Sequence, residues 1–266
     1  MRTLIWTFTT FLLLTALSCK KESIELPDLS GFAPEDCRAI ETYINNDLFE
    51  EFLYDAAGKL ERYNRYSNDK IYEYLTFEYD GENRLETYYY YFLLNDTIGR
   101  VYRYAFEYDT AGRPSQSNQY QRDYLDDPTE ELVLTTTFEH DPDGRLSELT
   151  FEQAADPDQV FTQTFEYDER GNTTRVDYIE NDELQSWNEY TYDDNPNRYS
   201  IFFELLTFLV QHNNQLEFKS SRYLPMTTNV IVEKNVFEYE YYENGLVKVQ
   251  TSSTSSQEKK YKYACE

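Results

Sequence analysis

Residues 106–113 read FEYDTAGR, and variants of this stretch recur along most of the chain. The shared unit is aromatic, Glu, aromatic, Asp, two variable residues, Gly or Asn, then a basic residue that Leu often follows. Its copies begin at Phe52, Phe77, Phe106, Phe138, Phe165 and Tyr239, and Tyr190 begins a further, incomplete one. A unit repeated every 25 to 32 residues between Asp55 and Asp193 indicates one supersecondary element used many times.

The unit itself predicts a β-hairpin. Its Asp can accept hydrogen bonds from backbone amides inside a type I turn, and its Gly supplies the left-handed residue that closes the turn as a bulge. Strand alternation then sends the Phe, Tyr and Leu side chains to one face and the charged ones to the other. We expect cross-strand ion pairs between Asp55 and Lys59, Asp80 and Arg84, Asp109 and Arg113, and Asp141 and Arg145.

The spacing predicts the fold class. A step near 25 residues fits two strands, a tight turn and a short return. Six or seven such hairpins give an all-β fold, an antiparallel meander of about a dozen strands forming a strongly twisted, curved or partly closed sheet. We expect a single domain over residues 37–266, in which the apolar run 201–210 is a buried strand or short helix that covers an open end or the concave face. A loop that dips into a membrane or binds a partner is the alternative for this run.

Composition narrows the functions. The 266 residues contain 50 acidic against 24 basic side chains and a formal net charge of -26, which argues against nucleic acid as a partner. The chain has 27 Tyr and 17 Phe, so rings supply most of its buried apolar area and favour strands.

The N-terminus predicts a lipid anchor. A short apolar run ends in Ala-Leu-Ser-Cys, which resembles a relaxed bacterial lipobox: residues 1–18 would be the signal peptide and Cys19 the acylated first residue. The alternative is an ordinary signal peptide with a cysteine near its end. Residues 19–36 read as a lipid-linked tether, and the charges after Cys19 favour the outer membrane facing the cell exterior, with a periplasm-facing position still open.

Two further cysteines, Cys37 and Cys265, stand at the two ends of the mature chain. Outside the reducing cytoplasm we expect a disulfide between them, worth roughly 5 kcal/mol at most in the chain-entropy model, and the alternative is two unpaired buried thiols. With only two histidines, a Cys/His zinc site is excluded.

The unit resembles the YD repeat of RHS-like proteins. Together with the lipobox and the acidic, Tyr-rich body, it makes the chain similar to the YD-repeat lipoproteins of the Bacteroidetes over roughly residues 49–250. Large RHS proteins wind such repeats into a shell around a cargo. This chain has too few copies for a large shell, so the resemblance implies the hairpin fold and the envelope location but no cargo.

No stretch of the sequence carries a catalytic, nucleotide-binding or metalloprotease motif. His140 occupies the Tyr slot of its repeat, and no nucleophile is spaced to pair with His212. The Glu of the unit recurs at one position and predicts a solvated acidic face, although carboxylates outside the cytoplasm leave calcium as a possible cofactor.

The run from Tyr88 to Tyr91 offers a contact site, because rings at consecutive positions point to both faces of a strand. Tyr88, Tyr89, Tyr90 and Tyr91 are therefore our candidate ligand-contact aromatics, unless a closed or doubly covered sheet buries them. The expected function is non-enzymatic: a lipoprotein that binds a glycan, a protein or an envelope component. A carboxylate-dependent hydrolase of extracellular polymer and a purely structural envelope protein are the alternatives.

Overall fold

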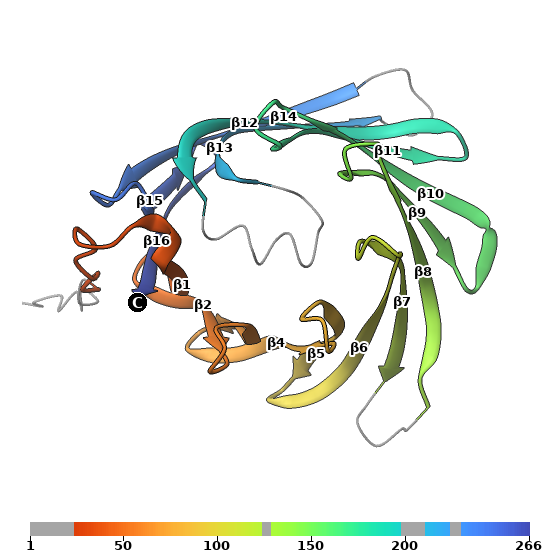
Figure 1. Ribbon diagram of the computed structural model, residues 1–266, viewed down its shortest axis with the longest axis horizontal. Coiled ribbons are helices and arrows are strands. Elements are labelled where there is room, and N and C mark those ends of the chain that lie inside the picture. Colours follow the sequence, from red (N-terminus) through yellow and green to blue (C-terminus); the bar gives the residue numbers. More distant parts are fainter. Residues whose placement is uncertain (1–23, 124–128, 198–210, 224–229) are drawn as a thin grey trace, which may run out of the picture.

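The computed structural model describes residues 24–123, 129–197, 211–223 and 230–266, which form one closed antiparallel β-barrel (Figure 1). Each strand pairs with its neighbours in sequence, and the ring closes between β1 and β16. A short 3-10 helix, η1, precedes the barrel at Pro34–Asp36. The strands are β1 (Cys37–Ile44), β2 (Asp47–Tyr54), β3 (Leu60–Ser67), β4 (Lys70–Tyr79), β5 (Leu85–Leu94), β6 (Thr97–Tyr108), β7 (Pro114–Asp123), β8 (Glu131–His140), β9 (Leu146–Gln153), β10 (Asp156–Tyr167), β11 (Thr173–Glu180), β12 (Glu183–Pro196), β13 (Asn213–Tyr223), β14 (Val230–Tyr241), β15 (Val247–Ser252) and β16 (Ser255–Cys265).

The all-β antiparallel meander is confirmed, but two features of the expected sheet are corrected. The described residues form sixteen strands rather than about a dozen, and the sheet closes fully rather than partly. Closure removes the last free edge: Cys37 pairs with Cys265 in the β1–β16 ladder, and a disulfide joins the same two residues. The expected disulfide is thus present, and it fastens the seam of the barrel.

The repeat unit forms the predicted turn. The Asp109 amide donates to the Arg113 carbonyl (2.8 Å), the Gly112 amide donates to the Asp109 carbonyl (3.0 Å), and Gly112 has φ +79°. Oδ1 of Asp109 accepts the amides of Ala111 and Arg113. The same backbone bonds recur at Asp55, Asp80, Asp141, Asp168 and Tyr242. The turn therefore needs both its first and its fourth residue, as expected from the pattern.

Two-residue turns at the opposite end of the barrel join successive hairpins. Both central residues have positive φ, a backbone typical of type I′ turns, for which Asn and Asp are well suited. They are Asn45-Asn46, Asn68-Asp69, Asn95-Asp96 and Asn181-Asp182. These tight returns keep their residues in the ladder, and the strands beyond the seven expected hairpins are β1 and β16, which lie before the first copy of the unit and after the last one.

Three of the four expected ion pairs across the repeat turn are present. Guanidinium groups of Arg84, Arg113 and Arg145 lie 2.7–2.8 Å from the turn aspartates. The expected pair of Asp55 with Lys59 is wrong. Lys59 lies over the ring of Tyr79 at 4.8 Å and donates to Asn83 in the next turn, so its ammonium bridges two turns instead.

The tyrosine of the unit links neighbouring strands. Its hydroxyl donates to the backbone carbonyl at the start of the preceding strand, so each bond spans one ladder near the repeat turns. The pairs are Tyr54 to Ala39, Tyr79 to Leu60, Tyr108 to Leu85, Tyr167 to Leu146 and Tyr192 to Thr173, at 2.6–2.9 Å. His140 occupies this slot in β8 and has no such bond.

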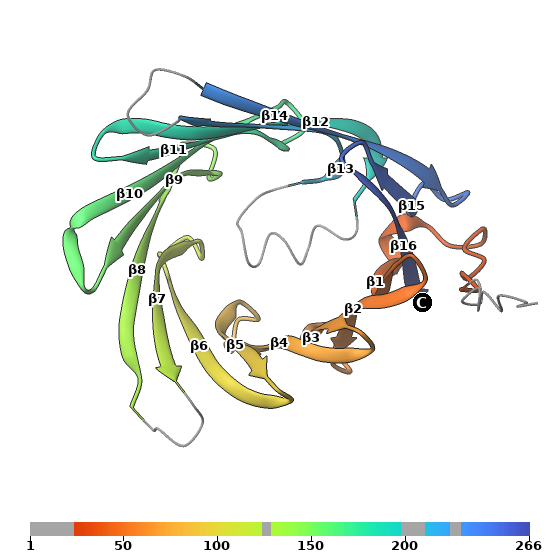
Figure 2. The ribbon, with the colours of Figure 1, turned by 180° about the vertical axis from the view of Figure 1, so that it is seen from behind.

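The position of the N-terminal segment, residues 24–30, shows which face of the sheet points out of the barrel. This segment lies outside the ring (Figures 1 and 2) and lines a pocket together with Lys248 and Lys260. Lys260 therefore points outward, and Tyr261 points inward. Following the strand register from Tyr261 places most of the buried apolar side chains on the inner face: Phe52, Tyr63, Leu75, Phe77, Tyr88, Phe138, Leu149, Phe165, Val176 and Tyr190.

Residues 24–36, which we expected to belong to the tether, lie against the barrel. Leu29 is only 3% exposed and belongs to the main apolar cluster, and Asn244 donates to the carbonyl of Phe32. Apolar side chains in this segment gain by leaving water, which a polar tether would not. The run 201–210, expected to cover the barrel, lies outside the described residues. No helix in the described part of the chain is long and apolar enough to span a membrane.

Candidate binding site on the inner wall

The four consecutive tyrosines of β5 alternate between the two faces, as a strand requires. Tyr88 and Tyr90 point inward, and Tyr89 and Tyr91 point outward. Tyr88 is 8% exposed and stacks on Tyr104, with ring centroids 4.3 Å apart, so its ring is already covered. The other inward ring, Tyr90, lines a cavity that a ligand could enter.

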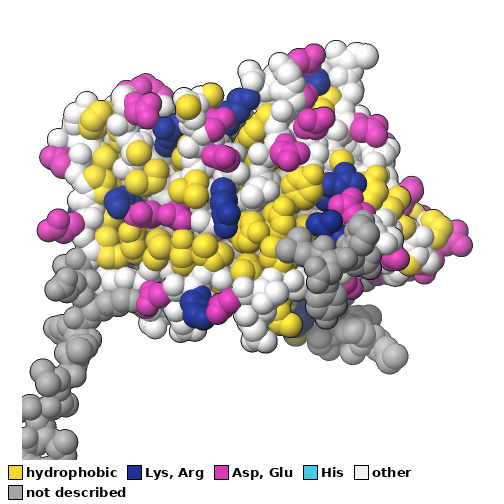
Figure 3. Space-filling model, turned by 90° about the horizontal axis from the view of Figure 1, so that it is seen from below, with side chains coloured by type: hydrophobic (Ala, Val, Ile, Leu, Met, Phe, Trp, Pro, Cys, Tyr) yellow, Lys and Arg dark blue, Asp and Glu magenta, His cyan; other side chains and the backbone are white. Residues whose placement is uncertain are grey.

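The outward pair belongs to a stacked cluster. Tyr91 stacks on Tyr74 at 4.4 Å, and the guanidinium of Arg62 covers the other side of Tyr74 at 4.0 Å. Figure 3 looks onto this side of the barrel and shows charged side chains of both signs spread among hydrophobic ones. The ring of Tyr91 is therefore packed against that of Tyr74, whose ring also contacts a guanidinium group.

The inner cavity, which we call the wall pocket, has a volume of about 470 Å³ and lies at the type I′ turn end of β5 and β6. Its lining residues are Tyr90, Phe92, Leu94, Gly99, Arg100 and Tyr102. Phe92 is 41% exposed, while the rings of Tyr90 and Tyr102 lie nearly parallel with centroids 6.1 Å apart. The pocket thus offers one open aromatic ring, Phe92, beside a pair of ordered rings, and its volume is within the range of small-molecule sites.

Polar groups are fixed around these rings. Arg100 donates to Asp123 (2.7 Å) and to the hydroxyl of Tyr102 (3.1 Å). The Tyr90 hydroxyl donates to Glu73, which also forms an ion pair with Arg65. Burial and then the hydrogen bond to Glu73 raise the pKa of Tyr90, so its hydroxyl stays protonated at physiological pH. The wall pocket therefore combines apolar ring faces with oriented donors and acceptors.

A second polar cluster lies on the inner face beside β1 and β16. Glu50 is 4% exposed and accepts from Thr42 (2.6 Å) and Tyr63 (2.7 Å), and Lys259 lies 2.9 Å away. Burial opposes its ionisation, but Lys259, Thr42 and Tyr63 outweigh burial and hold the pKa of Glu50 below its ordinary value. A carboxylate that stays ionised in this way does not suit a general acid, which needs a raised pKa.

Neither histidine joins these groups. Burial, followed by the charge of Arg113, lowers the pKa of His140, which lies in a turn tyrosine slot. His212 lies beside Gly171, so that a methyl group at Gly171 would be 3.3 Å from its Nε2. Among the described residues, no group of three or more His, Cys, Asp or Glu side chains could hold a metal ion.

Several residues of the two inner clusters were not among our candidates: Glu50, Glu73, Phe92, Arg100, Tyr102 and Lys259. The signal for three of them was present in the repeat. Counting back by two from Phe52 reaches Glu50, and counting back by four from Phe77 reaches Glu73, so the phase of the motif sends both inward. The same alternation, continued from Tyr88 and Tyr90, places Phe92 on the inner face as well.

No protein family model matches the sequence, and no curated protein sequence matches it. Solved structures of similar shape include a porin-like protein from Bacteroides uniformis, with 12% identity, TM-score 0.46, and coverage of 82% of this chain and 89% of that one. A porin-like protein from Bacteroides vulgatus has 11% identity, TM-score 0.49, and coverage of 84% and 97%. The TcdB2-TccC3-Cdc42 structure has 11% identity, TM-score 0.29, and coverage of 82% of this chain and 13% of that chain. No family membership follows from these similarities.

Proposed function

We propose that this chain is a lipid-anchored protein of the bacterial outer membrane that binds a carbohydrate in the wall pocket without transforming it. The observation that carries the proposal is the wall pocket, with an open ring at Phe92 beside fixed polar groups at Arg100 and Tyr102. A sugar presents the matching chemistry, because its C–H faces pack on aromatic rings and its hydroxyls need oriented hydrogen-bond partners.

Two features support the envelope location, and a third bears on how the protein is held there. The N-terminus carries the signal and lipobox pattern ending in Cys19, and the Cys37–Cys265 disulfide suits an oxidising compartment. The outer face of the barrel is charged, for example where Glu139 stands opposite Glu148 in the β8–β9 ladder. A barrel inserted in lipid needs an outward apolar band about 25 Å tall. We therefore propose that an anchor at Cys19, and not the barrel, holds the protein at the membrane, with the barrel facing the cell exterior.

The binding test uses the processed chain, residues 19–266, with Cys19→Ala to keep it free of lipid. A glycan array identifies a bound sugar, and calorimetric titration measures its affinity. We expect Phe92→Ala to weaken binding about tenfold or more, because a central aromatic contact contributes upwards of about 1.4 kcal/mol. Leu132→Ala is the matched control, since Leu132 is equally exposed (42%) but lies on the outer face of β8.

An array without any bound sugar, or equal affinities for Phe92→Ala and the parent chain, would refute binding in the wall pocket. Release of shortened products from a bound polymer would instead favour the hydrolase alternative. The anchor is tested separately: the intact mass of protein from membranes should include acyl chains on Cys19, and protease added to intact cells should degrade it if it faces outward. An unmodified Cys19 refutes the anchor, and protection from the protease refutes the outward orientation.

A further inference from the structure

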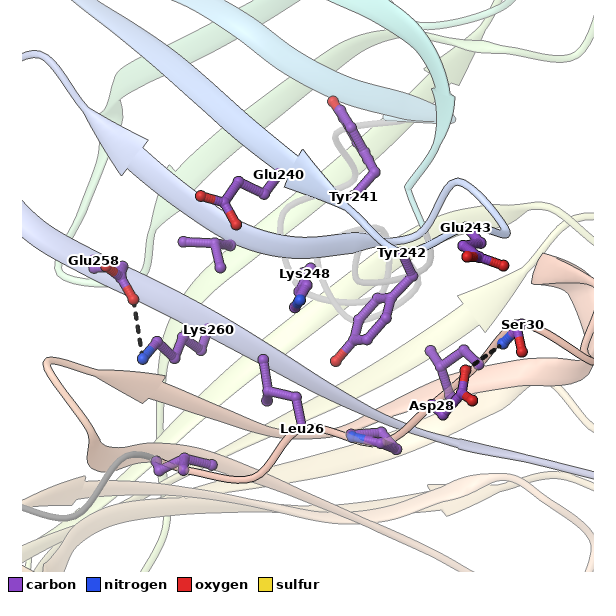
Figure 4. A pocket seen from close by; sticks show the side chains of 14 residues that line it. Leu26, Asp28, Ser30, Glu240, Tyr241, Tyr242, Glu243, Lys248, Glu258 and Lys260 are labelled. Atoms are coloured by element: carbon purple, nitrogen blue, oxygen red, sulfur yellow. Dashed lines mark hydrogen bonds and ion pairs between the residues drawn. The ribbon is translucent and has the colours of Figure 1, made fainter.

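A second cavity lies on the outside of the barrel, between residues 24–30 and strands β14–β16 (Figure 4). Its volume is about 610 Å³, and we call it the strap pocket after the segment that crosses it. The strap lines it mainly with apolar side chains, among them Leu26 and Leu29, together with Asp28 and Ser30. The strands contribute most of the charged groups, beside Tyr242 and Val249. The strap pocket is therefore amphipathic, and no part of it is shared with the wall pocket.

The two lysines on the strand wall differ in whether a carboxylate pairs with their ammonium group. Lys260 binds Glu258 at 3.0 Å and Asn46 at 2.8 Å, so its ammonium is engaged within the protein. Lys248 has only the ring of Tyr242 at 5.9 Å and no carboxylate at ion-pair distance among the described residues. Figure 4 shows Lys248 in the middle of the strap pocket, with Glu240 and Glu243 to either side. An anion at Lys248 would thus be flanked by two carboxylates.

This arrangement excludes a simple anion and favours a zwitterion. The pocket lining holds four carboxylates, from Asp28, Glu240, Glu243 and Glu258, against two lysines, so its field repels a ligand with net negative charge. A ligand with a phosphate next to an ammonium satisfies both signs, because the phosphate can pair with Lys248 while the ammonium pairs with Glu240 or Glu243. The apolar strap adjoins these groups and would contact hydrocarbon attached to the phosphate.

We propose that the strap pocket binds the phosphoethanolamine headgroup of a membrane lipid, with the acyl chains leaving past the strap. The position of the anchor supports this source. Residues 19–23 connect Cys19 to the strap and can span at most about 17 Å, which keeps the strap pocket at the surface of the membrane that holds the anchor. The inference rests on the anchorage proposed above and is independent of sugar binding. The barrel would then meet the membrane in one orientation.

The probe is dihexanoyl phosphatidylethanolamine at concentrations below those at which it forms micelles. It is titrated into the processed Cys19→Ala chain, and binding is followed by calorimetry. We expect saturable binding that Lys248→Ala weakens at least fivefold, and that Glu240→Gln with Glu243→Gln weakens by a similar factor. Phe92→Ala is the control, because it alters the wall pocket and leaves the strap pocket intact.

A second lipid probe separates the contributions of the phosphate and the ammonium. Dihexanoyl phosphatidylglycerol keeps the phosphate and lacks the ammonium, so it should bind at least fivefold more weakly. Equal affinity for both lipids would overturn the zwitterion assignment, and absence of saturable binding, or a Lys248→Ala chain that binds like the parent, would overturn the site. Lipid binding by a chain that binds no sugar would leave this inference standing while the proposed sugar function fails.

Discussion

Replacing Tyr79 by Phe removes one inter-strand hydroxyl bond and leaves the rest of the barrel unchanged. The hydroxyl donates to the Leu60 carbonyl at 2.9 Å, while the ring, which packs beside the apolar cluster and under Lys59, is kept. A net hydrogen bond of this kind contributes about 1 kcal/mol to the free energy of unfolding. With a urea m value near ~3 kcal/mol/M, the unfolding midpoint should fall by roughly 0.3 M while m stays the same.

The assay is urea unfolding of the processed chain, followed by far-UV circular dichroism and by fluorescence, whose transitions should coincide. Tyr91→Phe is the matched control, because Tyr91 keeps its stack on Tyr74 and its hydroxyl makes no hydrogen bond to another described residue. Its midpoint should not move. Equal midpoints for Tyr79→Phe and the parent chain, or equal losses in both variants, would show that the hydroxyl links do not stabilise the barrel.

Three other outcomes follow from the same structure. His140→Tyr should raise the urea midpoint by up to about 0.3 M, because the new hydroxyl can reach the Pro114 carbonyl at the start of β7; a lower midpoint would contradict the slot assignment. Cys37→Ser with Cys265→Ser should lower the midpoint by more than ~1 M, since the bridge closes a loop of sequence separation 228, and a smaller loss would mean the ladder alone closes the seam. The lowered pKa of Glu50 means that its stabilisation is complete above the unfolded value of 4.5 and is lost as pH falls through the lower folded pKa. Between about pH 6 and about pH 3, the urea midpoint of the Glu50→Gln variant should therefore fall less than that of the parent chain. If the two plots of midpoint against pH run parallel, Glu50 does not contribute this pH dependence.

The repeat turns could be predicted because their chemistry is local. Asp109 and Gly112 sit three residues apart, and the bonds they make stay within the turn. The phase of the strands follows from the same few residues, which is why Tyr79 stands opposite Leu85 as expected. The disulfide could be inferred from compartment and cysteine number alone.

Closure and the strand count were not predictable in the same way. Closure depends on β1, whose residues carry no copy of the unit, finding β16 at the far end of the chain. The strand count exceeds the expected one because β1 and β16 lie outside the copies of the unit, so the repeated motif does not mark them. The wall pocket needs three-dimensional information, because Arg100 and Asp123 meet only when β6 and β7 are in register.

Because a ladder and a disulfide join β1 to β16, the chain could begin at another point of the ring without changing the barrel. Around the ring, no hairpin is structurally first, so the closed barrel does not itself require the chain to begin at β1. Linking residue 266 back to the start of β1 and opening the chain at Asn95-Asp96 would keep every ladder, since ends that lie together permit circular permutation. A lipid anchor attached at the new N-terminus would then lie at the β5–β6 turn, while the interior of the barrel stayed the same.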